Sequence, residues 1–173
     1  PSIGVEALKH GVSVVKNREE ARKEISRILE DKLYREREAH LGYRKVMTED
    51  TYRERVNFIC QKIGFNPGSN ENKPMVSLVC VTNRPEMIEN IVSNFKRQVY
   101  PNLELILCLT ANNSDYKLAK TQIKDSRIKL LRVGKSLKLG TCLNKGFGRA
   151  RGDYIGKFDD DDFYGKNYVS DQM

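Results

Sequence analysis

The chain has 173 residues, of which 39% are hydrophobic, and this proportion excludes a wholly disordered protein because it is enough to form a core. Lysine and arginine number 31 against 23 acidic residues, which gives a net charge of +8. That charge fits either a lysine-rich surface or an anionic partner such as a nucleotide, a nucleic acid or an acidic membrane, and composition does not separate these alternatives.

The cysteines are widely spaced and form no Cys-x-x-Cys pair; they are Cys60, Cys80, Cys108 and Cys142. Each lies in an apolar stretch, where a reduced thiol packs as a small hydrophobic group. We therefore expect a reducing, cytoplasmic location rather than a disulfide scaffold or a zinc site. We expect no transmembrane segment and no signal peptide. Because the chain begins with Pro1 and stops abruptly after Met173, we expect a piece of a larger protein.

The first part of the chain, residues 1–64, predicts a mainly helical segment with a short strand near its beginning. Residues 12–15 are mostly β-branched, which is typical of a strand. Asn17 is a candidate helix N-cap, with Glu20 at the spacing of a capping box. The helix that follows carries apolar residues on one face, namely Ile25, Ile28, Leu29 and Leu33.

A second helix is expected to begin near Thr48 or Asp50. It is expected to end before Gly64, since glycine suits the left-handed conformation that follows a helix. Residues 65–74 then combine turn-forming residues with little apolar content, which is typical of a linker between domains.

From residue 75 to residue 173, strand and helix patterns alternate and predict an α/β domain. Apolar segments indicate four buried strands, at residues 76–81, 103–109, 128–133 and 154–158. Helices are expected between them, beginning at Pro85, at Ser114 or Asp115, and at Leu139, the last reaching about Arg149 and ended by Gly152. Such an alternation forms a parallel sheet with right-handed crossovers, and ligands bind beyond the carboxyl ends of its strands. One rim of the sheet should therefore carry residues 82–84, 110–114 and 159–162.

Four consecutive aspartates, Asp159 to Asp162, directly follow the last predicted strand. Adjacent carboxylates repel each other, so this run is unfavourable unless solvent or a cation neutralises it. One interpretation is a solvated acidic turn that caps a helix beginning near Tyr164. The other is a site for Mn²⁺ or Mg²⁺, which bind carboxylate and phosphate oxygens. The position at the ligand-binding rim favours the cation site, where the ion would neutralise a diphosphate leaving group.

Other polar residues are suited to an anionic ligand. Thr82, Asn83 and Arg84 lie where the first strand meets a helix N-terminus, which has free backbone N–H groups. Lys138 precedes the helix that leads to the acidic strand and could lie over a phosphate. For Arg84 and Lys138 the alternative is an ordinary solvated surface position. Residues 146–148 contain two glycines within a helical pattern, which predicts close packing rather than a phosphate loop.

Several of these segments, in this order, resemble glycosyltransferase family 2. Residues 76–85 look like the opening strand and loop of that family, and residues 138–146 are similar to its central helix. Residues 150–155 resemble the turn into the next strand, and residues 158–164 look like the Asp-x-Asp motif in its usual setting. The resemblance covers residues 75–173 and implies the N-terminal part of a Rossmann-like GT-A fold, a nucleotide-diphospho-sugar donor and Mn²⁺ or Mg²⁺.

The resemblance also implies roles for individual residues. The donor-binding residues would be Thr82, Asn83, Arg84, Lys138, Asp159 and Asp160, and the metal ligands would be Asp161 and Asp159. Relatives usually place an acidic residue directly after the second strand to contact the base, but residues 110–113 contain none, which leaves uridine as the base in doubt. The general base that activates the acceptor lies far downstream in the family. We therefore expect these residues to bind donor and metal without turnover, while the acceptor, a glycan or a protein, and the catalytic residues are unknown.

Residues 1–15, and residues 4–8 in particular, resemble the tail of a GT-B glycosyltransferase, and the charged helices that follow fit such a tail. In that family a glutamate placed like Glu6 approaches the donor. Because most of that fold is absent, we interpret Glu6 as the remnant of a site.

Functions from other classes remain open. The chain could be a non-catalytic nucleotide-binding or protein-interaction module. Nucleic-acid binding is suggested by net charge alone, without interleaved aromatic and basic residues, and we expect no nucleic-acid partner. A nucleotidyltransferase of related topology is a further alternative, although no Gly-rich loop follows the first strand.

Overall fold

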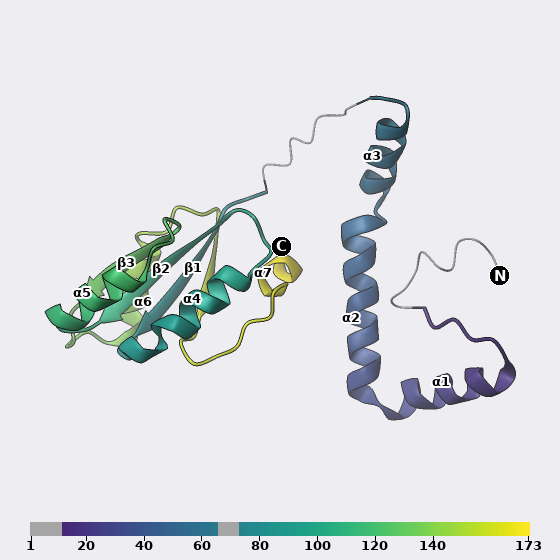
Figure 1. Cartoon of the computed structure of the whole chain (residues 1–173), viewed down its shortest axis with the longest axis horizontal. Helices are drawn as coiled ribbons and strands as arrows, with labels where there is room; N and C mark the ends of the chain where they lie inside the picture. The colour runs from purple at the N-terminus through teal and green to yellow at the C-terminus, as the bar shows by residue number, and fades with distance from the viewer. Residues whose placement is uncertain (1–11, 66–72) are drawn as a thin grey trace. The chain divides into compact units, whose positions relative to one another are not determined.

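The computed structural model describes residues 12–65 and 73–173. The chain divides into two compact units, Pro1–Asn70 and Glu71–Met173, which Figure 1 shows as a set of helices and an α/β domain. The division falls inside the predicted linker, residues 65–74. Glu6 and the resemblance placed on residues 4–8 lie outside the described residues.

The described part of the first unit is made of helices α1 (Arg18–Glu30), α2 (Lys32–Glu49) and α3 (Tyr52–Lys62). The predicted capping box at the start of α1 is confirmed, because Glu20 N–H donates to Asn17 Oδ1 at 2.9 Å. The Glu20 carboxylate in turn accepts a hydrogen bond from Lys16 N–H at 2.8 Å. The strand predicted at residues 12–15 is wrong, since these residues are exposed and form no strand. Within the described part of the chain no strand pairs with them, and a lone strand has no ladder to stabilise it.

The helix predicted to continue through Leu33 is interrupted at Asp31. This residue has an extended backbone with φ −97° and ψ 95°, so α1 ends there. Its carboxylate accepts a hydrogen bond from Tyr34 N–H at 2.9 Å and thereby caps a new helix, α2. A short polar side chain that caps the following helix stabilises such a break. For this reason α2 was not predicted as a separate helix.

Helix α3 begins at Tyr52, a few residues later than predicted, because Thr51 caps it. The Thr51 hydroxyl accepts a hydrogen bond from Glu54 N–H at 3.3 Å. Gly64 follows the helix with φ +73°, which confirms the left-handed conformation expected there.

The second unit is a parallel sheet whose strands all match the predicted segments. They are β1 (Val76–Thr82), β2 (Leu103–Thr110), β3 (Ile128–Val133) and β4 (Tyr154–Phe158). Their order in the sheet is β3-β2-β1-β4, and every neighbouring pair is parallel. The helices between the strands are a short 3₁₀ helix η1 (Pro85–Met87), α4 (Ile88–Arg97), α5 (Asn113–Gln122) and α6 (Leu139–Phe147), and α7 (Tyr168–Gln172) follows β4. The α/β fold with a parallel sheet is therefore confirmed.

Two helix boundaries differ from the prediction. Helix α5 is capped by Asn112, whose Oδ1 accepts a hydrogen bond from Asp115 N–H at 2.9 Å, rather than by Ser114 or Asp115. Helix α6 ends at Phe147, before the predicted Arg149 and well before Gly152.

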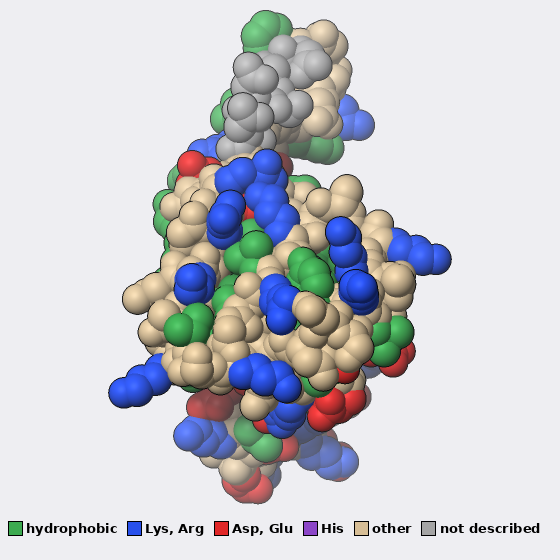
Figure 2. Space-filling view, turned by 90° about the vertical axis from the view of Figure 1, so that its left-hand side faces the viewer, with side chains coloured by type: hydrophobic (Ala, Val, Ile, Leu, Met, Phe, Trp, Pro, Cys, Tyr) green, Lys and Arg blue, Asp and Glu red, His purple; other side chains and the backbone are tan. Residues whose placement is uncertain are grey.

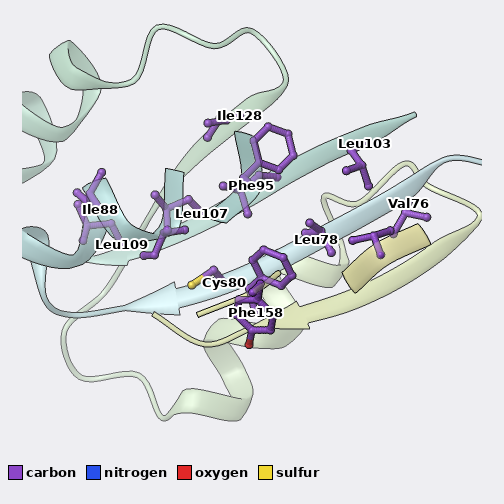
Figure 3. Packing of buried hydrophobic residues seen from close by; sticks show 14 of the residues in the cluster. Val76, Leu78, Cys80, Ile88, Phe95, Leu103, Leu107, Leu109, Ile128 and Phe158 are labelled. Atoms are coloured by element: carbon purple, nitrogen blue, oxygen red, sulfur yellow. The ribbon is translucent and has the colours of Figure 1, made fainter. Parts of the chain in front are cut away.

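Helices cover the sheet on both faces. On one face α4 and α5 pack against alternate strand residues, and Figure 3 shows Ile88 and Phe95 of α4 beside Leu107 and Leu109 of β2. On the other face α6 packs through Cys142 against a second cluster, which contains Val79, Ile106, Cys108 and Val133. Burial on both faces explains the continuous apolar character of β1 and β2. No helix in the described ranges is long and apolar enough to cross a membrane.

Candidate functional site

A cleft of about 560 Å³ opens at the carboxyl ends of the strands. Thr82, Asn83 and Arg84 line it where β1 ends, and Asp159 and Asp160 line it where β4 ends. Strands β1 and β4 are parallel neighbours, so residues 78 positions apart in the sequence meet here, as Thr82 and Asp160 do. Further residues complete the lining, namely Val81, Thr110, Lys135, Leu137, Leu139 and Cys142.

Asp160 is the most firmly held of the four aspartates. It is 9% exposed, and its Oδ2 accepts hydrogen bonds from the Thr82 hydroxyl at 2.5 Å and from Arg84 Nε at 3.0 Å. Its Oδ1 accepts a further hydrogen bond from Arg84 Nη2 at 2.5 Å. The guanidinium therefore binds this carboxylate through two parallel N–H groups, a geometry that strengthens and orients an ion pair.

These contacts decide the charge of Asp160. Burial opposes its ionisation, but hydrogen bonds from Arg84 and Thr82 outweigh burial and hold the pKa of the carboxyl below its ordinary value. The same carboxylate, together with Asp161, raises the pKa of the Arg84 guanidinium. At neutral pH both groups are charged, and the end of β4 is tied to the loop that follows β1.

The other three aspartates are more exposed. Asp159 pairs with Lys157, and Asp161 Oδ2 accepts a hydrogen bond from Arg84 Nη2 at 3.0 Å. The side chains of Asp159 and Asp161 are 48% and 59% exposed. Asp162 is also exposed, and neither it nor Asp161, the predicted metal ligand, is among the residues that line the cleft. The four carboxylates therefore do not behave as one cluster.

Two lysines lie near this end of the sheet. Lys138 is the N-cap residue of α6 and its side chain is exposed, but it is not among the residues that line the cleft. Lys135, which was not predicted as a site residue, does line it. Figure 2 shows many lysine and arginine side chains, interspersed with apolar ones, on the face that it presents. Such a surface attracts anionic ligands.

The side chains that hold the acidic segment in place were not predicted from the sequence. Tyr164 stacks on Phe158, with ring centroids 3.9 Å apart, and its hydroxyl oxygen accepts a hydrogen bond from Asp159 N–H at 2.8 Å. Three amide side chains of α4 and its C-cap also contact this segment, namely Asn90, Asn94 and Gln98. Their spacing of four residues, beside the apolar face of α4, is the signal that could have identified them.

The sequence matches the family described as Glycosyl transferase family 2 over residues 78–173, which is more than half of the chain. The chain belongs to glycosyltransferase family 2. A protein from Haemophilus influenzae, named as an uncharacterized glycosyltransferase, is 31% identical over 103 residues, which make up 57% of this chain and 32% of that protein.

Solved glycosyltransferase structures share the fold of the second unit. A mannosyltransferase from Pyrobaculum calidifontis, in complex with GDP-Man and Mn²⁺, aligns with a TM-score of 0.51 at 18% identity, covering 67% of this chain and 37% of that one. TarS 1–349 from S. aureus aligns with a TM-score of 0.50 at 17% identity, covering 57% of this chain and 31% of that one. The same protein in complex with UDP-GlcNAc aligns with a TM-score of 0.50 at 17% identity, covering 57% of this chain and 30% of that one.

These similarities confirm the predicted GT-A fold. This chain spans 32% of the length of the Haemophilus influenzae relative, and it covers a similar share of the solved glycosyltransferases. The family match begins at residue 78, so the resemblance of residues 1–64 to a GT-B tail stays a prediction.

Proposed function

We propose that the second unit binds the nucleotide-diphospho-sugar donor of a glycosyltransferase that transfers the sugar to an acceptor hydroxyl. The observation that carries the proposal is the shared cleft, in which residues 82–84 and the Asp159–Asp160 pair line one cavity at the carboxyl edge of the sheet. Open α/β sheets bind their ligands at this edge. The GDP-Man and UDP-GlcNAc bound to the two solved glycosyltransferases support a donor of this chemical class.

A divalent cation, Mn²⁺ or Mg²⁺, is part of the proposal. Among the residues that the structure describes, no three His, Cys, Asp or Glu side chains come together as a metal site. Cations of this type are often held by one or two carboxylates and completed by substrate phosphates. The solvent-accessible carboxylates of Asp159 and Asp161 fit that arrangement, and Mn²⁺ in the Pyrobaculum calidifontis structure supports it. The cation would supply charge neutralisation for the departing diphosphate.

The remaining cleft residues take complementary roles in the proposal. Arg84 keeps Asp160 ionised and oriented, while Thr82 and Asn83 lie where the nucleoside would enter. Lys135 and Lys138 supply positive charge toward the phosphates. The four free cysteines support the expected cytoplasmic, reducing location.

Calorimetric titration of the 173-residue chain with UDP and with GDP, each with and without Mn²⁺, tests this proposal. We expect binding that depends on Mn²⁺ and that Asp161→Ala weakens by about tenfold or more, since the cation loses a ligand. Glu89→Ala is the matched control, because it removes the same charge from an exposed position on α4 outside the cleft.

The alternative outcomes separate the candidate functions. Nucleotide binding that survives Asp159→Ala and Asp161→Ala unchanged would favour a non-catalytic nucleotide-binding module. If the unaltered chain binds neither nucleotide, with or without Mn²⁺, the proposed donor site is wrong.

A further inference from the structure

The segment that carries the aspartates has no regular secondary structure of its own. Residues 159–165, called here the acidic loop, form neither helix nor strand, so the loop's carbonyl oxygens have no ladder partners. Side chains of α4 take the place of those partners. Asn90, Asn94 and Gln98, called here the amide stripe, follow one another at intervals of four residues and therefore share one side of the helix.

Asn94 fixes the far end of the acidic loop. It is fully buried, its Nδ2 donates to the carbonyl oxygen of Asp162 at 2.8 Å, and its Oδ1 accepts a hydrogen bond from Tyr164 N–H at 3.0 Å. Its Oδ1 also accepts a hydrogen bond from Arg97 Nη1 at 2.8 Å. Every polar group of this side chain is engaged, and such a satisfied buried amide holds the backbone it contacts in one conformation.

Gln98 anchors the loop further along the chain. Its Nε2 donates to the carbonyl oxygen of Gly165 at 3.1 Å, and its Oε1 accepts a hydrogen bond from Val169 N–H at 3.2 Å. Both amides are buried in the interior between α4 and the loop, so their loss is expected to affect folding itself.

Asn90 contacts the part of the loop that faces the cleft. Its Nδ2 donates to the carbonyl oxygen of Asp160 at 2.8 Å and to that of Asp162 at 3.1 Å. These two carbonyls belong to the residues on either side of Asp161. The first carbonyl lies in the peptide group that joins Asp160 to Asp161, and the second lies in the peptide group that follows Asp162, so one amide group holds the backbone on both sides of Asp161. Asn90 is only partly buried, so it can be replaced with less disturbance to the core than Asn94.

We propose that Asn90 is a positioning residue for the metal-binding carboxylate Asp161, an inference that rests on the proposed function. Asn90 does not line the cleft, so its role would be exercised through the acidic loop and not by contact with the ligand. It acts by holding the acidic loop, so that the Asp161 carboxylate has its metal-binding orientation before the cation and the diphosphate bind. A site that is ordered before binding avoids the entropic cost of ordering the loop on binding.

Two substitutions at Asn90 test the inference. Asn90→Ala removes the donor without adding charge, and Asn90→Asp keeps the size of the side chain but turns a carboxylate toward two carbonyl oxygens. Binding of Mn²⁺ is followed by the electron paramagnetic resonance signal of the free ion, in the presence of UDP and, separately, of GDP. The melting temperature of each variant is measured in parallel, and binding is compared at a temperature where all variants are folded.

We expect the dissociation constant for Mn²⁺ to rise about fivefold in Asn90→Ala and about tenfold or more in Asn90→Asp, while the melting temperature changes by a few degrees at most. The control is Gln122→Glu, which introduces the same charge change as Asn90→Asp at an exposed position at the end of α5. It should bind Mn²⁺ as the unaltered chain does.

Each outcome decides between the inference and the function on which it rests. Unaltered Mn²⁺ affinity in both Asn90 variants overturns the positioning role and leaves the donor site intact. Equal weakening in Gln122→Glu overturns it as well, because the effect would then be one of charge alone. Variants that do not fold would make Asn90 a purely structural residue. If the unaltered chain binds no Mn²⁺ with either nucleotide, the proposed function and the inference are both wrong.

Discussion

At the scale of single residues, a buried carboxylate links the starts of β1, β2 and β3 to the turn that precedes β4. Glu104, at the beginning of β2, is 1% exposed and accepts hydrogen bonds from the Ser77 hydroxyl at 2.7 Å and from Arg151 N–H at 2.8 Å. It also pairs with the Arg151 guanidinium at 3.0 Å and with Lys129 at 2.9 Å. Because Arg151 precedes β4, this carboxylate fixes where β4 enters the sheet, and hence where the acidic loop leaves it.

The charge of Glu104 makes stability depend on pH. Burial works against ionisation, but hydrogen bonds from Lys129, Ser77 and Arg151 outweigh it and lower the pKa of Glu104 from 4.5 to about 2. A depressed folded-state pKa adds stability above the unfolded value, and that contribution is lost as the pH falls from about 4.5 toward 2.

We therefore expect Glu104→Gln to lower the free energy of unfolding by about 2 kcal/mol at neutral pH. The neutral amide no longer forms ion pairs, so the charges of Lys129 and Arg151 lose their counter-charge. Urea unfolding from pH 7 down to pH 3 measures the effect, and the difference from the unaltered chain should shrink below about pH 4.5. Glu89→Gln, on the exposed side of α4, serves as the control and should leave stability unchanged. If the difference in free energy of unfolding between Glu104→Gln and the unaltered chain stays constant across this pH range, the lowered pKa of Glu104 is contradicted.

At the scale of elements, the contact between α6 and the sheet depends on one glycine. A Cβ atom at Gly146 would lie 2.5 Å from Val79 Cγ1 and 3.1 Å from Cys108 Sγ. The close packing predicted for residues 146–148 is therefore confirmed at Gly146, whereas a Cβ atom at Gly148 would lie near only the carbonyl oxygens of Asn144 and Lys145. The helix begins beside the cleft, since Leu139 and Cys142 line it, so this packing also sets one wall of the candidate site.

Alanine substitutions at two glycines of α6 should have opposite effects. Gly146→Ala is expected to lower the free energy of unfolding by about 1–3 kcal/mol through overpacking, although alanine favours a helix. Gly140→Ala, where nothing lies within 4 Å of the added Cβ, should leave stability unchanged or raise it by up to about 1 kcal/mol. Thermal unfolding followed by circular dichroism compares the two variants. Equal effects on stability would show that the space beside Val79 can accommodate a Cβ atom at Gly146.

Elements with a strong local pattern were predictable, and those fixed by a single side chain were not. Strands β3 and β4 begin and end at the predicted residues, because an apolar run between polar turns leaves little choice for the positions of the strand ends. The break at Asp31 was missed, since an aspartate within a helical pattern also fits an unbroken helix. Residues 12–15 have strand composition but no partner strand among the described residues, and pairing is a tertiary property that composition does not contain.

At the scale of the whole molecule, the two units differ in how they are stabilised. Within the described part of the first unit, residues 12–65, no residue is buried. The buried core belongs to the second unit and extends from Val76 to Val169. Helices without a buried face depend on local interactions, namely caps that contribute about 1 kcal/mol each and pairs such as Lys45 with Glu49 that contribute a few tenths of a kcal/mol.

The two units should therefore unfold separately. On heating, we expect the far-ultraviolet signal of the helices to fall gradually, before a cooperative transition of the α/β unit. Brief digestion with trypsin should degrade residues 12–62 first and leave a resistant fragment that begins at Ile63, since trypsin cleaves after Lys62 but not between Lys73 and Pro74. Mass spectrometry of the products checks this expectation, and a single cooperative transition with simultaneous loss of both parts would contradict it.

The arrangement of the candidate site followed from the sequence only in part. Thr82, Arg84 and Asp160 come together as the rule for parallel sheets predicts, because strand order brings their carboxyl ends to one edge. The four-residue spacing marks Asn90 and Asn94 as candidates, but their contacts do not follow from a rule of this kind. They join side chains to backbone carbonyls, and such bonds leave no periodic pattern of hydrophobicity along the chain.

Strand β4 has a neighbour on one side only, since within the described residues it pairs with β1 alone. Its outer edge therefore presents free backbone N–H and C=O groups, and the side chains of Tyr154 and Ile155 beside them are 55% and 51% exposed. An open edge of this kind is a template for a strand from another molecule. In concentrated solution, the β4 edges of two molecules can therefore pair with each other. A monomeric state then depends on preventing this pairing as well as on a stable core.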